Sequence, residues 1–236
     1  MPGHIIHLAA ASCILANSPM GECAANEFLL GSIVPDILER SNKKQSHFWS
    51  DVGFEKFERV PDLDAFCDKY GNQMSNPFVL GYYCHLYMDA LFMRTSWKRH
   101  FSFFDKDMQA NDLYDEVAFI GYRKHTKDDI SVYPREDFFS NAYYYGDYDR
   151  VNPYIVKNYN IRIPRLPSED IAYVEGVLLK ANDERMARMI EAANQFKNMP
   201  VEHITYDSTD RQLKVFLLSE FQYLIEETVN ETKKYI

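Results

Sequence analysis

The sequence predicts an all-α fold, in which a single multi-helix domain spans residues 1–236 around a buried central helix. Three observations lead to this prediction. Apolar residues recur at intervals of three and four in several segments, which is the spacing of one helix face. A chain of this length can bury a sizeable core without disulfides. The sequence also contains no internal repeat, low-complexity tract or linker that would divide it.

Helical patterns cover most of the chain. A first helix is expected over residues 4–18, where Pro19 ends it, and a second over 24–32, before a turn at 34–36. The other expected elements are short helical pieces within 40–62, an amphipathic helix over 63–70, a helical pattern over 111–130, a helix over 168–197 and a final helix from about 210 to the end.

The helical pattern is lost in a Tyr/Pro-rich segment over residues 134–167. It contains a tyrosine-rich run at 143–148 and the prolines Pro153, Pro164 and Pro167. These features predict a long, ordered aromatic loop inserted into the domain. Loops of this length in compact domains are often lids or substrate walls. The alternative is a surface insertion packed by its own tyrosines.

Composition and charge exclude several classes of partner and location. A formal charge of −9 argues against a broad basic surface, so no stable nucleic-acid partner is expected. The four cysteines show no C-x-x-C spacing and are expected to be reduced. The N-terminus lacks a signal-peptide pattern, and no apolar run is long enough for a transmembrane segment, so a cytoplasmic location is expected.

The central helix carries the strongest chemical signal. Asn76 can cap it and Pro77 suits its first turn, and His85 and Asp89 then lie four residues apart on one face of the apolar run 78–92. A buried carboxylate beside a buried imidazole is costly unless something compensates it. A divalent metal compensates both groups together. The alternative without metal is a buried hydrogen-bonded His–Asp pair.

The other histidines carry weaker signals when each is considered alone. A lone histidine on an apolar helix is more often a hydrogen-bonded core residue than a ligand. His125 and Asp129 repeat the spacing of four, but their charged neighbours favour a solvated face. His4 and His7 lie on adjacent turns of the first predicted helix.

Four sequence elements occur in an order that is more specific than any one of them. They are Pro2-Gly3-His4-Ile5-Ile6-His7, Leu30-Gly31-Ser32-Ile33-Val34-Pro35-Asp36, Ser46-His47-Phe48 and Gly81-Tyr82-Tyr83-Cys84-His85-Leu86-Tyr87-Met88-Asp89. In this order they resemble the zinc-dependent phospholipase C family, which is similar in fold to the single-strand-specific nucleases. The resemblance covers roughly residues 1–95.

The resemblance implies a set of metal ligands and one catalytic residue. Asp89 is implied to bridge two metals, and Asp36 to orient or deprotonate the attacking water as well as to bind metal. His7 is favoured over His4 as the N-terminal ligand, because a run of small apolar residues follows it. The implied ligands are His7, Asp36, His47, His85 and Asp89. Less direct candidates are His4, His100, His125 and Asp129.

The ligand types determine the expected cofactor. Imidazole and carboxylate together suit Zn²⁺, although they also bind Mn²⁺ or Fe²⁺. Secreted members of the family complete a three-metal cluster with an H-x-x-x-E pair, which this sequence lacks, and with a free N-terminal residue. Two Zn²⁺ ions are therefore expected, and one or three are the alternatives.

These ligands imply a phospholipase C-like hydrolase that uses a metal-activated water on a phosphodiester. The expected substrate is a small-molecule or lipid-derived phosphoester. A nuclease or nucleotidase of the same fold is one alternative, for which Arg94, Lys98 and Arg99 would supply basic residues; they also fit an ordinary basic helix C-terminus. A non-catalytic helical metal-binding protein is another.

Overall fold

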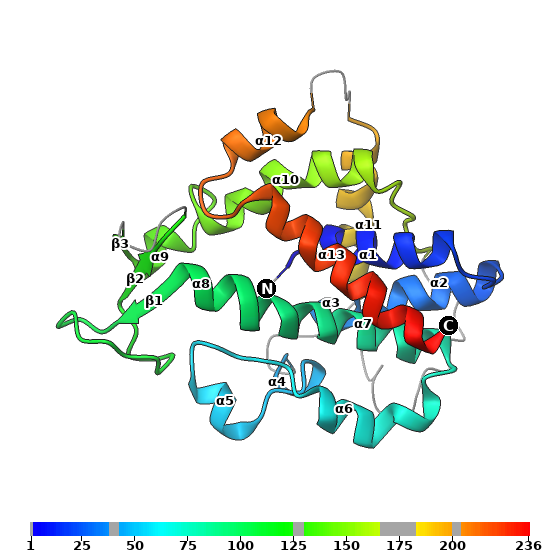
Figure 1. The fold of residues 1–236 in the computed structure, drawn as a ribbon, viewed down its shortest axis with the longest axis horizontal. Coiled ribbons are helices and arrows are strands. Elements are labelled where there is room, and N and C mark those ends of the chain that lie inside the picture. The colour runs from blue at the N-terminus through cyan, green and yellow to red at the C-terminus, as the bar shows by residue number, and fades with distance from the viewer. Residues whose placement is uncertain (1, 38–42, 125–129, 166–182, 200–203) are drawn as a thin grey trace.

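The computed structural model describes residues 2–37, 43–124, 130–165, 183–199 and 204–236. These residues are mostly helical and also form a small three-stranded sheet (Figure 1). The longer helices are α1 (His4–Ala16), α2 (Glu22–Gly31), α6 (Leu63–Tyr70), α7 (Pro77–Phe92), α10 (Tyr144–Asn158), α11 (Asp183–Lys197), α12 (Tyr206–Gln212) and α13 (Leu218–Thr232). The shorter ones are α3 (Val34–Ile37), α4 (Lys43–Ser46), α5 (Asp51–Glu55), η2 (Gly71–Gln73), η3 (Met93–Trp97), α8 (Lys98–His100), α9 (Arg135–Phe138) and η4 (Lys233–Tyr235).

Helix α7 lies at the centre of the fold. The Asn76 side chain caps it by accepting from the backbone N–H groups of Phe78 (2.9 Å) and Val79 (3.4 Å), and Pro77 opens its first turn, as predicted. Figure 1 shows α13 crossing α7, with α5 and α6 on one side of it and α10 and α12 on the other. The helix packs against α1, α2, α6 and α13, so nearly its whole surface is buried.

The backbones of α2 and α7 touch where they cross, because each helix has a glycine at the contact. A Cβ atom on Gly31 would lie 2.1 Å from the Phe78 carbonyl oxygen, and one on Gly81 would lie 2.1 Å from the Phe28 carbonyl oxygen. Only hydrogen fits at either position. These two glycines belong to two of the four sequence elements described above, and their contact fixes α7 against the chain that follows α2.

The prediction of a helix over 111–130 is wrong. Strands β1 (Phe101–Phe104), β2 (Phe119–Tyr122) and β3 (Ser131–Pro134) form an antiparallel sheet in the order β1-β2-β3. Ile120 and Tyr122, which matched a helical spacing, are both buried in β2. Pairing on both sides satisfies the backbone of this β-branched and aromatic segment, so tertiary contacts override its helical pattern. Residues 125–129 lie outside the described residues.

The prediction of a loop over 134–167 is also wrong, because the described part of this segment contains α9 and α10. Buried residues of α10 recur at helical spacing, with Tyr144, Tyr148, Val151 and Ile155 inside the protein. Two of these four buried residues are tyrosines and not aliphatic residues. In the sequence alone, the segment therefore looks like an aromatic loop. Pro153 lies within the helix and removes one backbone donor without ending it.

The predicted final helix is divided in two. Helix α12 ends at Gln212 and α13 begins at Leu218. Between them the buried Asp147 carboxylate accepts hydrogen bonds of 2.7–3.1 Å from three consecutive backbone N–H groups, those of residues 214–216. Arg150 donates to the same carboxylate (2.8 Å). In a continuous helix these three N–H groups would donate to carbonyl oxygens one turn earlier. Here the Asp147 carboxylate accepts from them instead, so the helix can be interrupted without leaving them unpaired.

The remaining helices follow the sequence predictions closely. The first helix, the second helix, the short pieces within 40–62 and the helix over 63–70 form within a few residues of their predicted ends. Of the helix predicted over 168–197, residues 168–182 lie outside the described residues, and α11 forms the rest. Cys13, Cys23, Cys67 and Cys84 are unpaired. Among the described helices, none is long and apolar enough to cross a membrane.

The close contact between α2 and α7 gives a direct test. We expect Gly81→Ala to lower the free energy of unfolding by about 3 kcal/mol, because the new methyl group can be accommodated only by moving a backbone. Chemical denaturation of both proteins measures the difference. Gly71→Ala is the matched control, since its Cβ would meet only Cys67 Cβ at 3.9 Å, and we expect a change within about 1 kcal/mol. Equal stability of Gly81→Ala and the wild type would contradict the contact.

Candidate metal centre

The five residues implied as ligands converge on one site, although they come from four separate places in the chain. His7 lies on α1, Asp36 on α3, His47 directly after α4, and His85 and Asp89 on α7. His7, His47, His85 and Asp89 are buried, whereas the Asp36 side chain is 18% exposed and forms the open edge of the group. We call these five residues the His/Asp cluster.

Asp89 connects the cluster through both of its carboxylate oxygens. Its Oδ1 lies 3.5 Å from His7 Nε2, and its Oδ2 lies 3.3 Å from His85 Nε2 and 3.7 Å from His47 Nε2. His47 Nε2 also lies 3.5 Å from Asp36 Oδ1. The imidazoles of His7 and His85 stack with their centroids 3.9 Å apart. One carboxylate is therefore surrounded by three imidazoles.

Backbone carbonyls fix the orientation of two of these imidazoles. His85 Nδ1 lies 2.9 Å from the Ser32 carbonyl oxygen, just beyond α2, and His47 Nδ1 lies 3.1 Å from the Lys43 carbonyl oxygen. A carbonyl oxygen only accepts, so His85 Nδ1 must carry the proton. The Ser46 hydroxyl also lies 2.9 Å from His47 Nδ1 and can donate or accept, so the Lys43 carbonyl favours the same tautomer at His47 without requiring it. In a neutral imidazole the Nε2 atom then presents a lone pair, and both Nε2 atoms face the carboxylates. Histidine ligands of metals are oriented in the same way.

The spacing inside the cluster fits a metal better than it fits hydrogen bonds. Within the described residues, His7 Nε2, His47 Nε2, His85 Nε2 and both Asp89 oxygens are buried without a hydrogen-bond partner. Charge-assisted N–H···O bonds measure about 2.7–2.9 Å, which is shorter than any of these N···O separations. Donor atoms around a tetrahedral zinc lie about 3.3 Å apart, since each is about 2.0–2.1 Å from the ion. The donor set and its spacing therefore fit zinc.

At His7, His47 and Asp89, the environment favours the protonation states of metal ligands. Burial lowers the pKa of His7, and the nearby His85 lowers it further. Burial likewise lowers the pKa of His47, despite the neighbouring Asp36. Burial alone would raise the pKa of Asp89, but His85 and His7 outweigh it and hold this pKa below its ordinary value. Neutral imidazoles beside an ionised carboxylate are the forms that bind a cation.

Burial and neighbouring charges also act against each other on the pKa values of Asp36 and His85. Burial alone would raise the pKa of Asp36, but His47, His85 and Lys43 hold it well below its usual range. Burial alone would lower the pKa of His85, but the charge of Asp89 raises it overall. His85 is therefore the imidazole that most readily shares a proton with the cluster, and Asp36 remains ionised at its open edge.

The less direct candidates are placed differently from one another. His4 lies beside the cluster, where burial lowers its pKa and Asp36 and His7 are its charged neighbours. His100 lies at the end of α8 instead, where its Nδ1 donates to the Arg123 carbonyl oxygen and its Nε2 lies 2.6 Å from Glu220 Oε1. Both of its ring nitrogens have partners, so the structure does not bring it to the cluster. The candidates at 125 and 129 lie outside the described residues.

Two adjoining cavities open beside the cluster. The smaller has a volume of about 550 Å³ and is lined by Asp36. The larger has a volume of about 1010 Å³. Their walls share Lys43, Trp49, Arg59, Tyr114 and Tyr145. Tyr145 belongs to the segment predicted to be an aromatic loop. It does line the cavities, but it does so from helix α10.

Sequence reasoning missed the cationic residues of these cavities. Lys43 and Arg59 line both cavities, whereas the basic residues singled out from the sequence, Arg94, Lys98 and Arg99, are exposed and line neither. Lys43 lies on the same short helix that precedes His47, so its proximity to the motif was the one available signal. Arg59 comes from an irregular segment and carried none.

Comparisons with known proteins identify no relative of this chain. No protein-family model matches it, and no match was found among curated proteins or solved structures.

The His100–Glu220 pair predicts an acid-sensitive contribution to stability. Burial alone would raise the pKa of Glu220, but the contact with His100 lowers it overall. A carboxyl whose pKa falls on folding stabilises the protein above its unfolded pKa, and this contribution is lost as the pH falls through the folded pKa. We therefore expect Glu220→Gln to cost about 1–3 kcal/mol of unfolding free energy at pH 7.

This cost should begin to shrink as the pH falls below the unfolded pKa of about 4.3, and it should be lost once the pH has fallen through the lower pKa of the folded protein. Urea denaturation at a series of pH values measures it. Glu226→Gln makes the same change on the exposed side of α13 and should have little effect at any pH. A cost that does not vary with pH would contradict the assignment to the ionised Glu220 carboxylate.

Proposed function

We propose that this protein is a metal-dependent phosphoester hydrolase, similar to phospholipase C, that binds zinc at the His/Asp cluster. The observation that carries the proposal is the group of buried donor atoms around Asp89 that lack hydrogen-bond partners among the described residues. Leaving so many polar atoms unsatisfied costs several kcal/mol, since each costs about 1–3 kcal/mol. A bound cation removes this cost for all of them together.

The arrangement of donors supports two metal positions. His7, His85 and Asp89 form one group whose ligand atoms lie within 4.8 Å of one another, and Asp36, His47 and His85 form a second. His85 is common to both groups, and its Nε2 atom can bind only one ion, so the other position would rely on an Asp89 oxygen in its place. Asp89 directs one oxygen toward His7 and the other toward His47 and His85. A carboxylate placed in this way can bridge two ions. Zinc suits the mixture of imidazole and carboxylate, and Mn²⁺ or Fe²⁺ is the alternative.

The mechanism follows from the position of Asp36. When bound, a divalent ion supplies Lewis acidity that makes water acidic near neutral pH. Asp36 is the one cluster residue whose side chain is partly exposed and lines a cavity. Its carboxylate can accept a hydrogen bond from the attacking water and orient it toward phosphorus. The buried walls around His7, His47 and His85 keep other water away from the cluster.

A phosphodiester, either soluble or derived from a lipid, is the proposed substrate. The nuclease or nucleotidase alternative gains support from one observation, because Trp49, Tyr114 and Tyr145 supply aromatic surfaces beside the cationic side chains of the cavity walls. Such rings can stack a nucleobase. A non-catalytic metal-binding protein is the other alternative, and it would bind zinc without hydrolysing any ester.

Metal content gives the first test. We expect the purified protein to contain two zinc ions per chain by plasma mass spectrometry after reconstitution, and Asp89→Asn to lose them, because the variant removes the carboxylate that faces all three imidazoles. Asp68→Asn changes an exposed carboxylate and should retain the zinc. Circular dichroism confirms that each variant is folded. A wild-type protein that takes up no zinc would overturn the proposal.

Hydrolysis gives the second test. We expect the zinc-loaded protein to hydrolyse bis(p-nitrophenyl) phosphate, and Asp36→Asn to lower kcat by about 10²–10⁴-fold if Asp36 acts as a base toward water. The Asp68→Asn variant again serves as the control. Parallel assays with phosphatidylcholine and with nucleoside monophosphates distinguish a lipase from a nucleotidase. Zinc binding without hydrolysis of any of these esters would favour the non-catalytic alternative.

A further inference from the structure

Lys43 is the cationic side chain nearest to the His/Asp cluster among the described residues. Its Nζ atom lies 3.2 Å from Asp36 Oδ1, and the same oxygen lies 3.5 Å from His47 Nε2. Its backbone carbonyl also accepts from His47 Nδ1. Helix α4 therefore places an imidazole in the cluster and an ammonium group at its open edge. This ammonium group contacts the cluster directly, through the Asp36 carboxylate.

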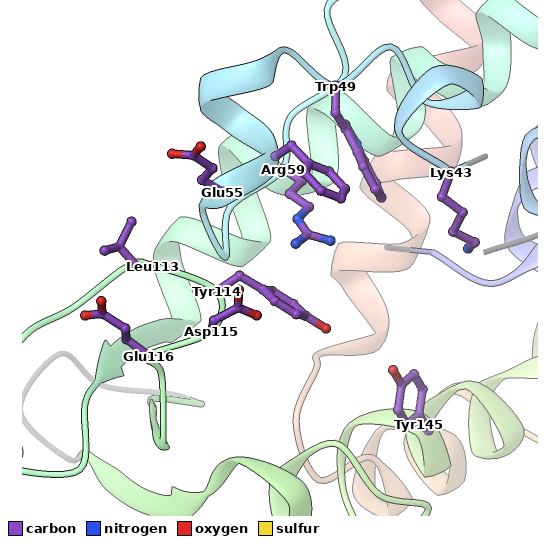
Figure 2. A pocket seen from close by; sticks show the side chains of 10 residues that line it. Lys43, Trp49, Glu55, Arg59, Leu113, Tyr114, Asp115, Glu116 and Tyr145 are labelled. Atoms are coloured by element: carbon purple, nitrogen blue, oxygen red, sulfur yellow. The ribbon is translucent and has the colours of Figure 1, made fainter. Parts of the chain in front are cut away.

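The side chain of Lys43 faces the cavities. It lines both of them and is 25% exposed. Figure 2 shows the Lys43 ammonium group, the Arg59 guanidinium group and the hydroxyl groups of Tyr114 and Tyr145 directed toward the same open space. All four are hydrogen-bond donors, and two carry positive charge. Of the acidic residues of the larger cavity, Glu55 and Glu116 lie away from Lys43 in this view, and Asp115 lies beside Tyr114.

We propose that Lys43 is a phosphate-binding residue, whose ammonium group holds a non-bridging oxygen of the substrate's phosphoryl group at the mouth of the cluster. The proposal rests on the proposed function, because it takes the reacting group to be a phosphoryl group. Its basis is geometric: an oxygen anion beside Asp36 lies within reach of Lys43. Ammonium groups bind phosphate oxygens through charge-assisted hydrogen bonds. Soluble and lipid-derived phosphoesters share this group, so Lys43 would contact both.

The neighbouring Lys44 provides a matched control on the same helix. Its Nζ pairs with Asp51 and lies 5.2 Å from the centroid of the Phe54 ring, and it lines neither cavity. Substitution of either lysine by glutamine removes one positive charge from α4. Both substitutions leave the backbone in place, so the Lys43 carbonyl that orients His47 is retained. Any difference between the two variants therefore reports the position of the ammonium group.

The experiment measures binding of inorganic phosphate to the zinc-reconstituted protein by isothermal titration calorimetry. We expect Lys43→Gln to weaken binding by about 10- to 100-fold, which is the range for losing a hydrogen bond to a charged group. Lys43→Arg keeps the charge and should restore most of the affinity. Lys44→Gln should change the affinity by no more than about twofold, since its charge is solvated and screened. Zinc content and thermal stability are measured on every variant.

Equal losses in the Lys43→Gln and Lys44→Gln variants, or unchanged binding in Lys43→Gln, would overturn the proposal. So would a wild-type protein that binds zinc but not millimolar phosphate. Phosphate binding that depends on Lys43, without hydrolysis of any ester, would support the phosphate-binding role and contradict the proposed hydrolase function. Hydrolysis that the Lys43→Gln substitution leaves unchanged would support the hydrolase and contradict the phosphate-binding role of Lys43.

The same variants are assayed with bis(p-nitrophenyl) phosphate and with a short-chain phosphatidylcholine. We expect KM to rise about 10-fold or more on each ester that the wild type hydrolyses, because Lys43 contacts the group that the two share. Where both are substrates, a rise on the lipid alone would contradict a contact with the phosphoryl group. The wild-type activities themselves identify which source of phosphoester the site uses.

Discussion

The backbone contact between α2 and α7 is the constraint on which the rest of the site depends. Gly31 and Gly81 let the two helices approach until a methyl group could not fit between them. At this separation the Ser32 carbonyl, just past the end of α2, reaches His85 Nδ1 on α7. The chain then turns into α3 and brings Asp36 to the same side. A wider crossing would separate both of these groups from α7.

The cluster holds a buried carboxylate without a hydrogen bond, which is costly unless a cation compensates it. Asp89 has no exposed surface, and within the described residues its oxygens accept no hydrogen bond. Three imidazoles surround it at 3.3–3.7 Å, which is too far for directed hydrogen bonds and close to the spacing of ligands around one ion. Asp147 is the contrast. It is equally buried, but backbone N–H groups and the Arg150 guanidinium satisfy its carboxylate, so it serves the fold and needs no metal ion.

The two proposals divide the work of the site between its buried and open parts. The buried part, around Asp89, holds fixed imidazoles whose orientation the backbone determines. The open part, at Asp36 and Lys43, faces cavities whose walls combine aromatic rings with cationic side chains. A phosphoryl group placed between them would meet the cluster on one side and ammonium on the other. The residues of the open edge come from short helices and irregular segments, whereas those of the buried part come mostly from the long helices α1 and α7.

The sequence by itself determined the helices that bury a continuous apolar surface, including α1 and α7, and the face on which His85 and Asp89 lie. Local signals were sufficient there, because the Asn76 cap, the Pro77 start and the spacing of four act within one helix. Only the tertiary structure decided the small sheet, helix α10 and the break before α13. In each case a distant partner satisfies the backbone or buries the side chains, as Asp147 does for residues 214–216. The positions of Lys43 and Arg59 beside the cluster likewise depend on long-range packing, which residue spacing does not encode.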